Sequence, residues 1–365
     1  MSLRSLDRMR RTADEAAGQG LVAIVVAPSP DLVYLTGYDP PPLERPTFLI
    51  VRPDRDPVMV VPRLERSLAA ASAAGERIEL VGWEDGVDPY ALAAGLLPPA
   101  GRVAAGDRMW ATHVLGLQRA APGLDLEPAG PIVGRIRAIK DEDELAALRR
   151  AARAADEAFR RIADEPFLGR REAEVAADLA ELLIAHGHAR ADFTIVASGP
   201  NAASPHHQPG DRRIQAKDAV VLDFGGELGG YHSDTTRTLV VGEPPLGFER
   251  VYQLVQEAQQ AACDAVRPGA RAHDVDRAAR QPIVDAGYGD AFFHRTGHGI
   301  GLEVHEPPWI AAGNQQALET GMTFSVEPGV YLEDKFGVRI EDIVAVTDDG
   351  VEHLNRSPRG LLVVD

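Results

Sequence analysis

The sequence predicts an α+β fold in two domains, and three observations support this class. The chain has 365 residues, which is more than a single hydrophobic core usually serves. Helical and strand-like patterns are mixed along it without the regular strand–helix alternation of a parallel sheet. The stretch P-A-G-P-I-V-G at 128–134 combines prolines and glycines and is the best candidate for a linker. We therefore expect one domain over 1–130 and a second over 134–365.

The first domain is predicted to be a small α/β unit. Helical patterns cover 2–17, an Ala-rich segment at 63–74 and a third segment at 110–121. Short apolar and β-branched runs predict strands at 21–26, 32–35, 47–51, 58–61, 78–81 and 102–105.

The second domain is predicted to mix helices and strands. Asp141 has the character of an N-cap, because acidic residues follow in the first turn and arginines come later, as the helix dipole favours. Further helices are expected at 171–186, 248–266 and 273–286, the last with a kink at Pro282. Strands are expected at 219–224, 235–241, 322–326, 338–346 and 361–364.

Composition excludes several classes of function. The formal charge of −17 opposes binding to nucleic acid or to an anionic membrane, because both would repel the protein. Cys263 is the only cysteine, so the chain has no intramolecular disulfide and no thiolate metal cluster. Its helical surroundings predict a buried, unreactive thiol. The N-terminus has no apolar segment of the signal-peptide type, and no apolar run approaches the length of a membrane span. A cytoplasmic enzyme is expected.

Four acidic residues lie in apolar, strand-like runs, where a carboxylate is costly to bury. They are Asp223 in A-V-V-L-D-F-G-G, Asp234 in D-T-T-R-T-L-V-V, Glu327 in M-T-F-S-V-E-P-G and Glu341 in V-R-I-E-D-I-V-A-V. Such a group must be paired or bound to a cation. For one residue alone, a salt bridge would be the simpler explanation. Arg237 and Arg339 can neutralise some of these carboxylates, but they leave most of the negative charge unmatched.

A stretch rich in histidine and glycine adds imidazoles to these carboxylates. It reads H-R-T-G-H-G-I-G-L-E-V-H and covers 294–305. Glycine lets a backbone approach a bulky group closely, and histidine binds metals or moves protons near neutral pH. Four carboxylates with one imidazole favour Mn²⁺, Co²⁺, Zn²⁺ or Fe²⁺. Because carboxylates bridge, five such ligands can hold two cations, an arrangement that activates water for hydrolysis.

These motifs together resemble the pita-bread metallopeptidases, the group of prolidase, aminopeptidase P and methionine aminopeptidase. The resemblance covers most of 134–365, and four separate motifs occur in the family's order: D-F-G-G-x-x-x-G-Y-H-S-D-T-T-R-T, T-G-H-G-I-G-L-E-V-H-E, S-V-E-P-G-V-Y and V-R-I-E-D. It implies a pita-bread catalytic domain after a smaller, creatinase-like N-terminal domain. It also implies two divalent metal ions, with Mn²⁺ favoured over Co²⁺, Zn²⁺ and Fe²⁺.

The resemblance assigns a role to each candidate residue. The implied metal ligands are Asp223, Asp234, His298, Glu327 and Glu341. The implied catalytic residues are Glu327 as general base, with His206 and His305 acting on the tetrahedral intermediate, the leaving group or the reacting carbonyl. The implied substrate-side residues are His294, Arg295, Arg339 and Tyr331. Packing alone is the alternative for His294. His207 is expected to face solvent or to support the site from behind its lining, and Gly225, Gly226, Gly229 and Gly230 are expected to serve a turn.

The first domain and the entry helix after I-R-A-I-K-D-E-D-E-L resemble the proline-specific branch of this family. The implied substrates are proline-containing di- or oligopeptides, and an Xaa-Pro dipeptidase is favoured. The alternatives are aminopeptidase P, which acts on longer Xaa-Pro chains, and a metal-binding interaction protein without hydrolytic activity. A dipeptidase has to neutralise the substrate's C-terminal carboxylate, and Arg295 is the candidate because Trp309 stands where some prolidases carry an arginine. Relatives are commonly homodimers, so a homodimer is expected.

Overall fold

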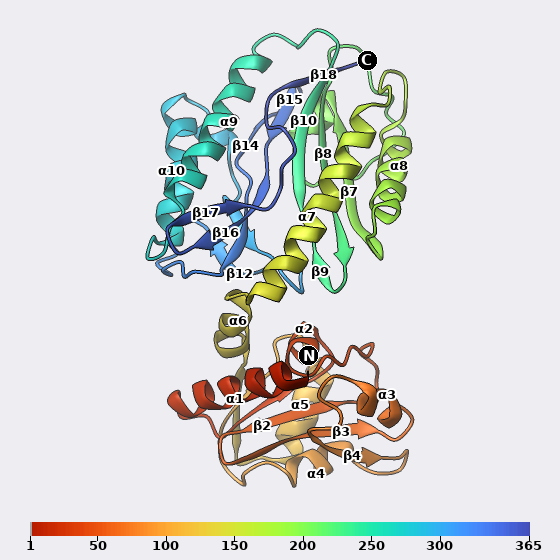
Figure 1. Cartoon of the computed structure of the whole chain (residues 1–365), viewed down its shortest axis with the longest axis vertical. Coiled ribbons are helices and arrows are strands. Elements are labelled where there is room, and N and C mark those ends of the chain that lie inside the picture. The colour runs from red at the N-terminus through yellow and green to blue at the C-terminus, as the bar shows by residue number, and fades with distance from the viewer. Residues whose placement is uncertain (1) are drawn as a thin grey trace. The chain divides into compact units, whose positions relative to one another are not determined.

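The structure is a computed structural model that describes residues 2–365 (Figure 1). The chain forms two compact units, with the division between Arg137 and Ala138. Both units combine helices with β-sheets, which confirms the predicted α+β class. No helix among the described residues is long and apolar enough to span a membrane.

Residues 2–137 contain one mixed sheet with strand order β4-β3-β2-β1-β5-β6. Its strands are β1 (Ala23–Val26), β2 (Phe48–Arg52), β3 (Arg55–Pro62), β4 (Glu79–Trp83), β5 (Gly101–Ala105) and β6 (Leu124–Pro128). The helices are α1 (Ser2–Gly18), α2 (Pro30–Thr36), α3 (Arg66–Ala71), α4 (Pro89–Ala94), α5 (Ala111–Ala120) and α6 (Gly130–Ala138). Phe48 and Val60 from the sheet pack with Trp83, Leu97 and Leu117 in its core.

The strand predicted at 32–35 is wrong, because this run lies in helix α2. Ser29 caps the helix by accepting a hydrogen bond from the Leu32 amide, and Pro30 occupies the first turn. Gly37, with φ of 71°, ends it in the left-handed conformation. Four apolar residues are too few to distinguish a strand from a buried helical turn, so the flanking cap residues decide the conformation.

The segment 128–134 is not an irregular linker. Strand β6 ends at Pro128, and helix α6 begins at Gly130. Pro131 lies in the first turn of α6, where a missing backbone N–H removes no helical hydrogen bond. Proline and glycine here mark a helix start.

Residues 138–365 contain two larger sheets, with strand orders β18-β10-β8-β7 and β12-β11-β13-β16-β17, and a two-stranded ribbon β14-β15. Short strand β9 pairs with β8. The strands are β7 (Arg190–Ser198), β8 (Ala219–Leu228), β9 (Tyr231–His232), β10 (Thr235–Val241), β11 (Gly297–Gly299), β12 (Glu306–Ile310), β13 (Thr323–Val326), β14 (Gly329–Leu332), β15 (Phe336–Arg339), β16 (Asp342–Thr347), β17 (Gly350–His353) and β18 (Leu362–Val364). The α-helices are α7 (Glu142–Ala163), α8 (Glu172–Ala185), α9 (Phe248–Ala265) and α10 (Ala272–Asp285).

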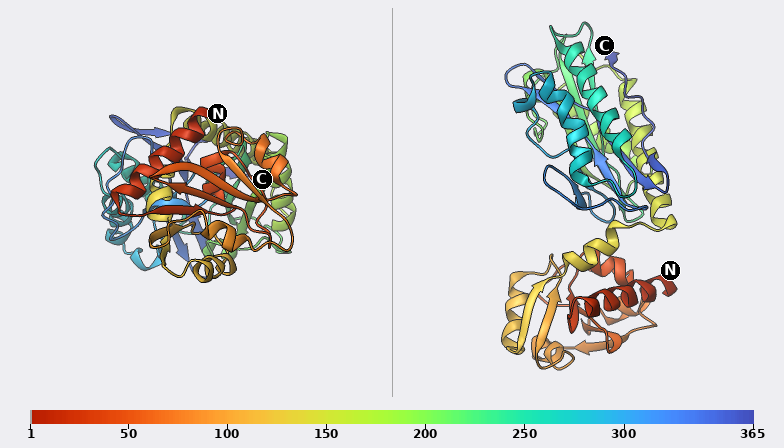
Figure 2. Two further views of the ribbon diagram at one scale, coloured as in Figure 1. Left: turned by 90° about the horizontal axis from the view of Figure 1, so that it is seen from below. Right: turned by 90° about the vertical axis from the view of Figure 1, so that its left-hand side faces the viewer.

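Two pairs of helices flank these strands (Figures 1 and 2). Helix α7 starts at the predicted Asp141 cap, which forms a reciprocal capping box with Glu144. Phe159 of α7 and Leu179 of α8 pack against Leu222 and neighbouring residues of β8. Helices α9 and α10 run side by side and cover the second sheet, where Cys263 is buried.

The strand predicted at 338–346 is interrupted. Strand β15 ends at Arg339 and β16 begins at Asp342, and the two strands belong to different sheets. Glu341 sits in the gap and forms an isolated bridge to Thr236, which lies in β10. Glu341 therefore lies beside β10, which belongs neither to the ribbon that contains β15 nor to the sheet that contains β16.

Candidate active site

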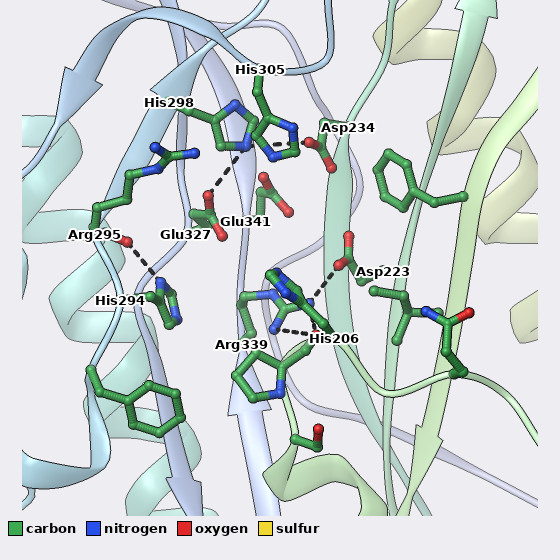
Figure 3. A pocket seen from close by; sticks show the side chains of 16 residues that line it. His206, Asp223, Asp234, His294, Arg295, His298, His305, Glu327, Arg339 and Glu341 are labelled. Atoms are coloured by element: carbon green, nitrogen blue, oxygen red, sulfur yellow. Dashed lines mark hydrogen bonds and ion pairs between the residues drawn. The ribbon is translucent and has the colours of Figure 1, made fainter.

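A cavity of about 830 Å³ in the second unit gathers the residues predicted from the motifs. Figure 3 shows their side chains converging from several strands and loops. The cavity is lined by His206, Asp223, Asp234, His294, Arg295, His298, His305, Glu327, Arg339 and Glu341, among others. Tyr331 contacts this set through Arg339 and His294.

A hairpin brings the two aspartates together. Asp223 lies in β8 opposite Thr236 of β10, and Asp234 directly precedes β10. Gly229 and Gly230, with φ of 63° and 85°, form the turn between β8 and β9, as predicted. Gly225 serves a different purpose, because a Cβ there would lie 2.1 Å from the Ser233 carbonyl oxygen. Because Gly225 has no side chain, the segment before Asp234 can approach β8 closely.

Glycines also explain how His298 reaches the cavity. The residue is the centre of β11, which is enclosed by β12 and β13. A Cβ at Gly297 would lie 1.8 Å from the Ser325 carbonyl oxygen, and one at Gly299 would lie 2.2 Å from that of Pro307. Ser325 joins this strand to the next predicted ligand, since its hydroxyl accepts from the His298 amide at 3.0 Å and donates to Glu327 Oε1 at 3.1 Å.

Three predicted ligands form a compact cluster. One potential ligand atom from each of Asp234, His298 and Glu341 lies within 4.8 Å of the other two. His298 Nε2 also lies 3.3 Å from Glu327 Oε1. The Thr236 hydroxyl donates to Glu341 Oε2 at 2.7 Å, whereas buried Glu341 Oε1 has no hydrogen-bond partner in the described chain. Asp223, also buried, lines the same cavity, and its charge contributes to the raised pKa of Asp234 and of Glu341.

Electrostatics make this cluster suited to a cation. Burial, followed by repulsion from neighbouring carboxylates, raises the pKa of Asp234 and of Glu341 well above their usual values. Burial and the neighbouring His305 lower the pKa of His298 to about 3, so its imidazole is neutral at pH 7 and has a free lone pair. Buried oxygens without counter-charge beside a neutral imidazole are the donor set of a divalent transition metal, and the residues therefore fit one.

A second group of cavity residues is already neutralised by the protein. Arg339 donates to Asp223 Oδ2 at 2.6 Å and to the Tyr331 hydroxyl at 2.8 Å. His294 Nδ1 donates to the Arg295 carbonyl oxygen at 2.7 Å, so its Nε2 accepts from the Tyr331 hydroxyl at 2.9 Å. Burial and nearby Arg339 lower the pKa of His294 to about 4. The result is a continuous chain from Arg339 through Tyr331 to a neutral His294.

The remaining predicted residues lie at different places on the cavity wall. The ring of His305 is centred 4.1 Å from that of His298, and His206 faces the cavity from the segment after η1 (Gly199–Ala203). The Arg295 guanidinium lies over the ring of Trp309, 4.4 Å from its centre. His207 is absent from the cavity lining and bonds to Glu172 instead.

Sequence reasoning missed the apolar part of the wall. Phe193 and Ile195 come from β7, and Phe293 precedes His294. The sequence pattern does not predict strand β7, so it gives no indication that Phe193 and Ile195 line the cavity. Phe293 is 64% exposed, an unusual state for so large an apolar side chain and one that only the structure reveals.

Models of two protein families match the chain. The model for metallopeptidase family M24 matches residues 146–348, and the creatinase/prolidase N-terminal domain matches residues 8–139. The chain belongs to metallopeptidase family M24. This M24 chain is therefore a metal-dependent peptidase, and the resemblance inferred from its four motifs is confirmed.

Individual relatives are similar over nearly the whole M24 chain. It is 45% identical over 362 residues to the "Probable dipeptidase PepE" of Mycobacterium tuberculosis, covering 98% of this chain and 96% of the relative. It is 35% identical to an Xaa-Pro dipeptidase of Lactobacillus delbrueckii subsp. lactis, covering 99% of both. The crystal structure of dipeptidase PepE from Mycobacterium ulcerans superposes with a TM-score of 0.96 at 43% identity, covering 100% of this chain and 98% of the other.

Proposed function

We propose that this M24 peptidase hydrolyses the peptide bond before proline and that its main substrates are Xaa-Pro dipeptides. One observation carries the proposal: buried carboxylates, one with an unpartnered oxygen, surround a neutral imidazole inside a substrate-sized cavity. The similarity to an Xaa-Pro dipeptidase over 99% of both chains supports the proline specificity. We place this activity in the domain 134–365 and assign 1–130 to a creatinase-like N-terminal domain. A cytoplasmic homodimer remains our proposal for the working form.

Five residues would hold two divalent cations, with Mn²⁺ as the favoured metal. They are Asp223, Asp234, His298, Glu327 and Glu341. When bound, such metals supply Lewis acidity and lower the pKa of bound water. Asp234 and Glu341 suit this purpose, because a bound cation relieves the repulsion that raises their pKa values, whereas Asp223 also pairs with Arg339.

The protein's own groups would move protons and orient the substrate. Glu327, whose Oε1 is held by the Ser325 hydroxyl, would accept a proton from the attacking water. His206 and His305 would donate hydrogen bonds to the oxygen that gains negative charge and to the leaving nitrogen. Arg339 and Tyr331 would keep neutral His294 oriented at the wall beside the substrate.

Arg295 would discriminate dipeptides from longer chains. It lines the cavity, and its stacking on Trp309 restricts the guanidinium to one orientation. A fixed guanidinium pairs well with a carboxylate, and a dipeptide places its C-terminal carboxylate one residue beyond the scissile bond. A longer peptide has a neutral amide at that position.

The test compares Ala-Pro with Ala-Pro-Ala as substrates, before and after chelation and with Mn²⁺ restored. We expect Mn²⁺-dependent hydrolysis of Ala-Pro that exceeds that of Ala-Pro-Ala. Arg295→Met should raise KM for the dipeptide more than KM for the tripeptide. Preference for the tripeptide would indicate aminopeptidase P activity. Bound metal without turnover of either peptide would contradict the proposed hydrolysis, as would undiminished activity of Glu327→Ala in metal-free buffer.

A further inference from the structure

The segment 198–210 forms part of the cavity wall but lies outside the four motifs that contain the proposed metal ligands. It begins at the end of β7, passes through η1 and presents Ser204, Pro205, His206 and Gln208 to the cavity. A loop that carries a reacting group needs contacts that hold it in place, because loops are otherwise the mobile parts of a fold.

Glu172 supplies such contacts from behind the loop. It is the first residue of α8, and its side chain is fully buried. One carboxylate oxygen accepts from the amide and hydroxyl of Ser198, at 2.8 and 2.7 Å, and from Asn201 at 3.0 Å. The other oxygen lies 2.8 Å from His207 Nε2, and the amide of Gly210 points to it at 3.4 Å. A single carboxylate thus binds the start, middle and end of the segment.

This carboxylate is well suited to remain ionised despite its burial. Burial acts to raise the pKa of Glu172, but hydrogen bonds from Ser198 and His207 hold that pKa below its usual value. Its place in the first turn of α8 adds the favourable field of the helix N-terminus. Charge-assisted hydrogen bonds of this kind are roughly twice as strong as neutral ones, so these ties hold the loop firmly.

Both sequence neighbours of His206 are held by hydrogen bonds. The Pro205 carbonyl oxygen accepts from the two terminal nitrogens of Arg339, at 3.5 and 3.4 Å. The His207 side chain bonds to Glu172. Between these two anchors only the side chain of His206 faces the cavity, as Figure 3 shows.

We propose that Glu172 is a positioning residue for the reaction, which sets the place of His206 by holding His207 and the rest of segment 198–210. The inference rests on the proposed peptidase function. Glu172 does not line the cavity, and the hydrogen bonds of its side chain go to the segment 198–210 and not to a proposed metal ligand, so its effect on turnover would pass through His206. A misplacement of a reacting group by about 1 Å can cost about 100-fold in rate, so loss of these ties has a measurable effect.

A double-mutant cycle on Ala-Pro hydrolysis tests this route. We expect Glu172→Gln to lower kcat by about 10- to 100-fold when His206 is present. In a His206→Ala background the same change should alter kcat by less than about 3-fold, because the group it positions is gone. Metal content should match that of the wild type. If the kcat losses of the two single variants multiply in the double variant, Glu172 has a general structural role and the proposal is overturned. A loss of metal in Glu172→Gln would overturn it as well.

Two further variants keep the test decisive. His207→Phe preserves a ring but removes the tie beside His206, so it should reproduce most of the loss even where Glu172→Gln folds poorly. Asp31→Asn removes a buried carboxylate that pairs with Arg137 in the first unit, and it controls for the loss of a buried charge. The Asp31→Asn change should lower the unfolding temperature. Its effect on kcat should be the same in the wild-type and in the His206→Ala background. If the His207→Phe variant has the same kcat as the wild type, the proposal is contradicted.

The failure of this inference is separable from the failure of the proposed function. If the wild type does not hydrolyse Ala-Pro, the function is wrong, and ¹⁵N-histidine NMR still reports on the positioning. Glu172→Gln should then shift the ring resonances of both His207 and His206. A shift of His207 alone would show that His206 does not depend on Glu172.

Discussion

Glu341 and Asp342 are consecutive, buried carboxylates with opposite electrostatic surroundings. Asp342 accepts a hydrogen bond from Arg237 Nη2 at 2.7 Å and forms an ion pair with Arg359, whose Nε lies 2.7 Å from Asp342 Oδ2. Burial alone would raise its pKa, but Arg237, His353 and Arg359 hold that pKa at about 2. For Glu341, burial and then repulsion from Glu327 and Asp223 raise the pKa well above its usual value.

The difference teaches that burial of a carboxylate does not by itself identify a ligand. Successive residues of an extended chain point to opposite faces, so Glu341 enters the cavity while Asp342 enters a polar cluster with two arginines. On one face two arginines lie against Asp342. On the other face Arg339 pairs with Asp223, and Glu341 Oε1 has no hydrogen-bond partner in the described chain. The unpartnered Glu341 Oε1 marks this carboxylate as a candidate cation ligand, whereas Asp342 belongs to a structural ion pair. Asp223 is paired with Arg339, so its proposed role as a ligand rests on the family resemblance and not on a missing counter-charge.

The largest expected effect is that of Glu341→Gln on activity. Loss of one of five proposed ligands should reduce Mn²⁺-dependent Ala-Pro hydrolysis by about 1000-fold or more, equivalent to about 4 kcal/mol. Metal content should fall as well. In chelator the variant should be at least as stable as the wild type, because an uncompensated negative charge has been removed. A marked loss of stability in the metal-free state would show that Glu341 is a structural carboxylate, like its neighbour.

The matched change Asp342→Asn should have the opposite profile. It leaves buried Arg237 without its carboxylate, and breaking a buried ion pair in this way costs about 3–5 kcal/mol. Denaturant unfolding of the metal-free protein measures this cost directly. Unchanged stability would mean that the arginines find other partners and that the contrast between the two residues is weaker than their contacts indicate.

A smaller effect is expected at half-buried His294, whose hydrogen bonds go to Tyr331 and the Arg295 carbonyl oxygen and not to a carboxylate. Its pKa is lowered from 6.5 to about 4, so the unfolded chain binds a proton between these pH values that the folded chain does not. Stability from this group is therefore present above pH 6.5 and is lost as the pH falls towards 4. Relative to His294→Gln, the metal-free wild type should lose about 2 kcal/mol more between pH 7 and pH 5. Parallel pH profiles of the two proteins would contradict the lowered pKa.

The smallest effect is predicted for Cys263, which lies near Asp342 but in an apolar cluster. Burial raises the pKa of this thiol to about 12, so it stays protonated and enclosed at neutral pH. The native protein should not react with a thiol reagent over minutes, and the unfolded protein should release one equivalent. Rapid labelling of the native state would show that the core between α9 and the second sheet opens readily.

Sequence alone was sufficient for several local patterns, although the strand predicted at 32–35 is wrong, because the apolar pattern alone takes no account of the neighbouring cap residues Ser29 and Gly37. The capping box at Asp141 and the turn at Gly229 and Gly230 follow from neighbouring residues, and the structure confirms them. The motifs around the five proposed ligands were also recognisable, because each is a short run of fixed spacing. Their spatial convergence agrees with the resemblance, while their individual roles stay proposals.

The tertiary structure decided what depends on residues distant in the chain. The run at 338–346 broke at Glu341 because β15 and β16 pair with different strands. The same holds for Glu172, whose hydrogen bonds reach up to 38 residues along the chain and which no motif singled out. Local patterns determined which residues can bind a cation. Only long-range packing decided which buried charges find partners, because counter-charges come from segments that sequence spacing does not connect.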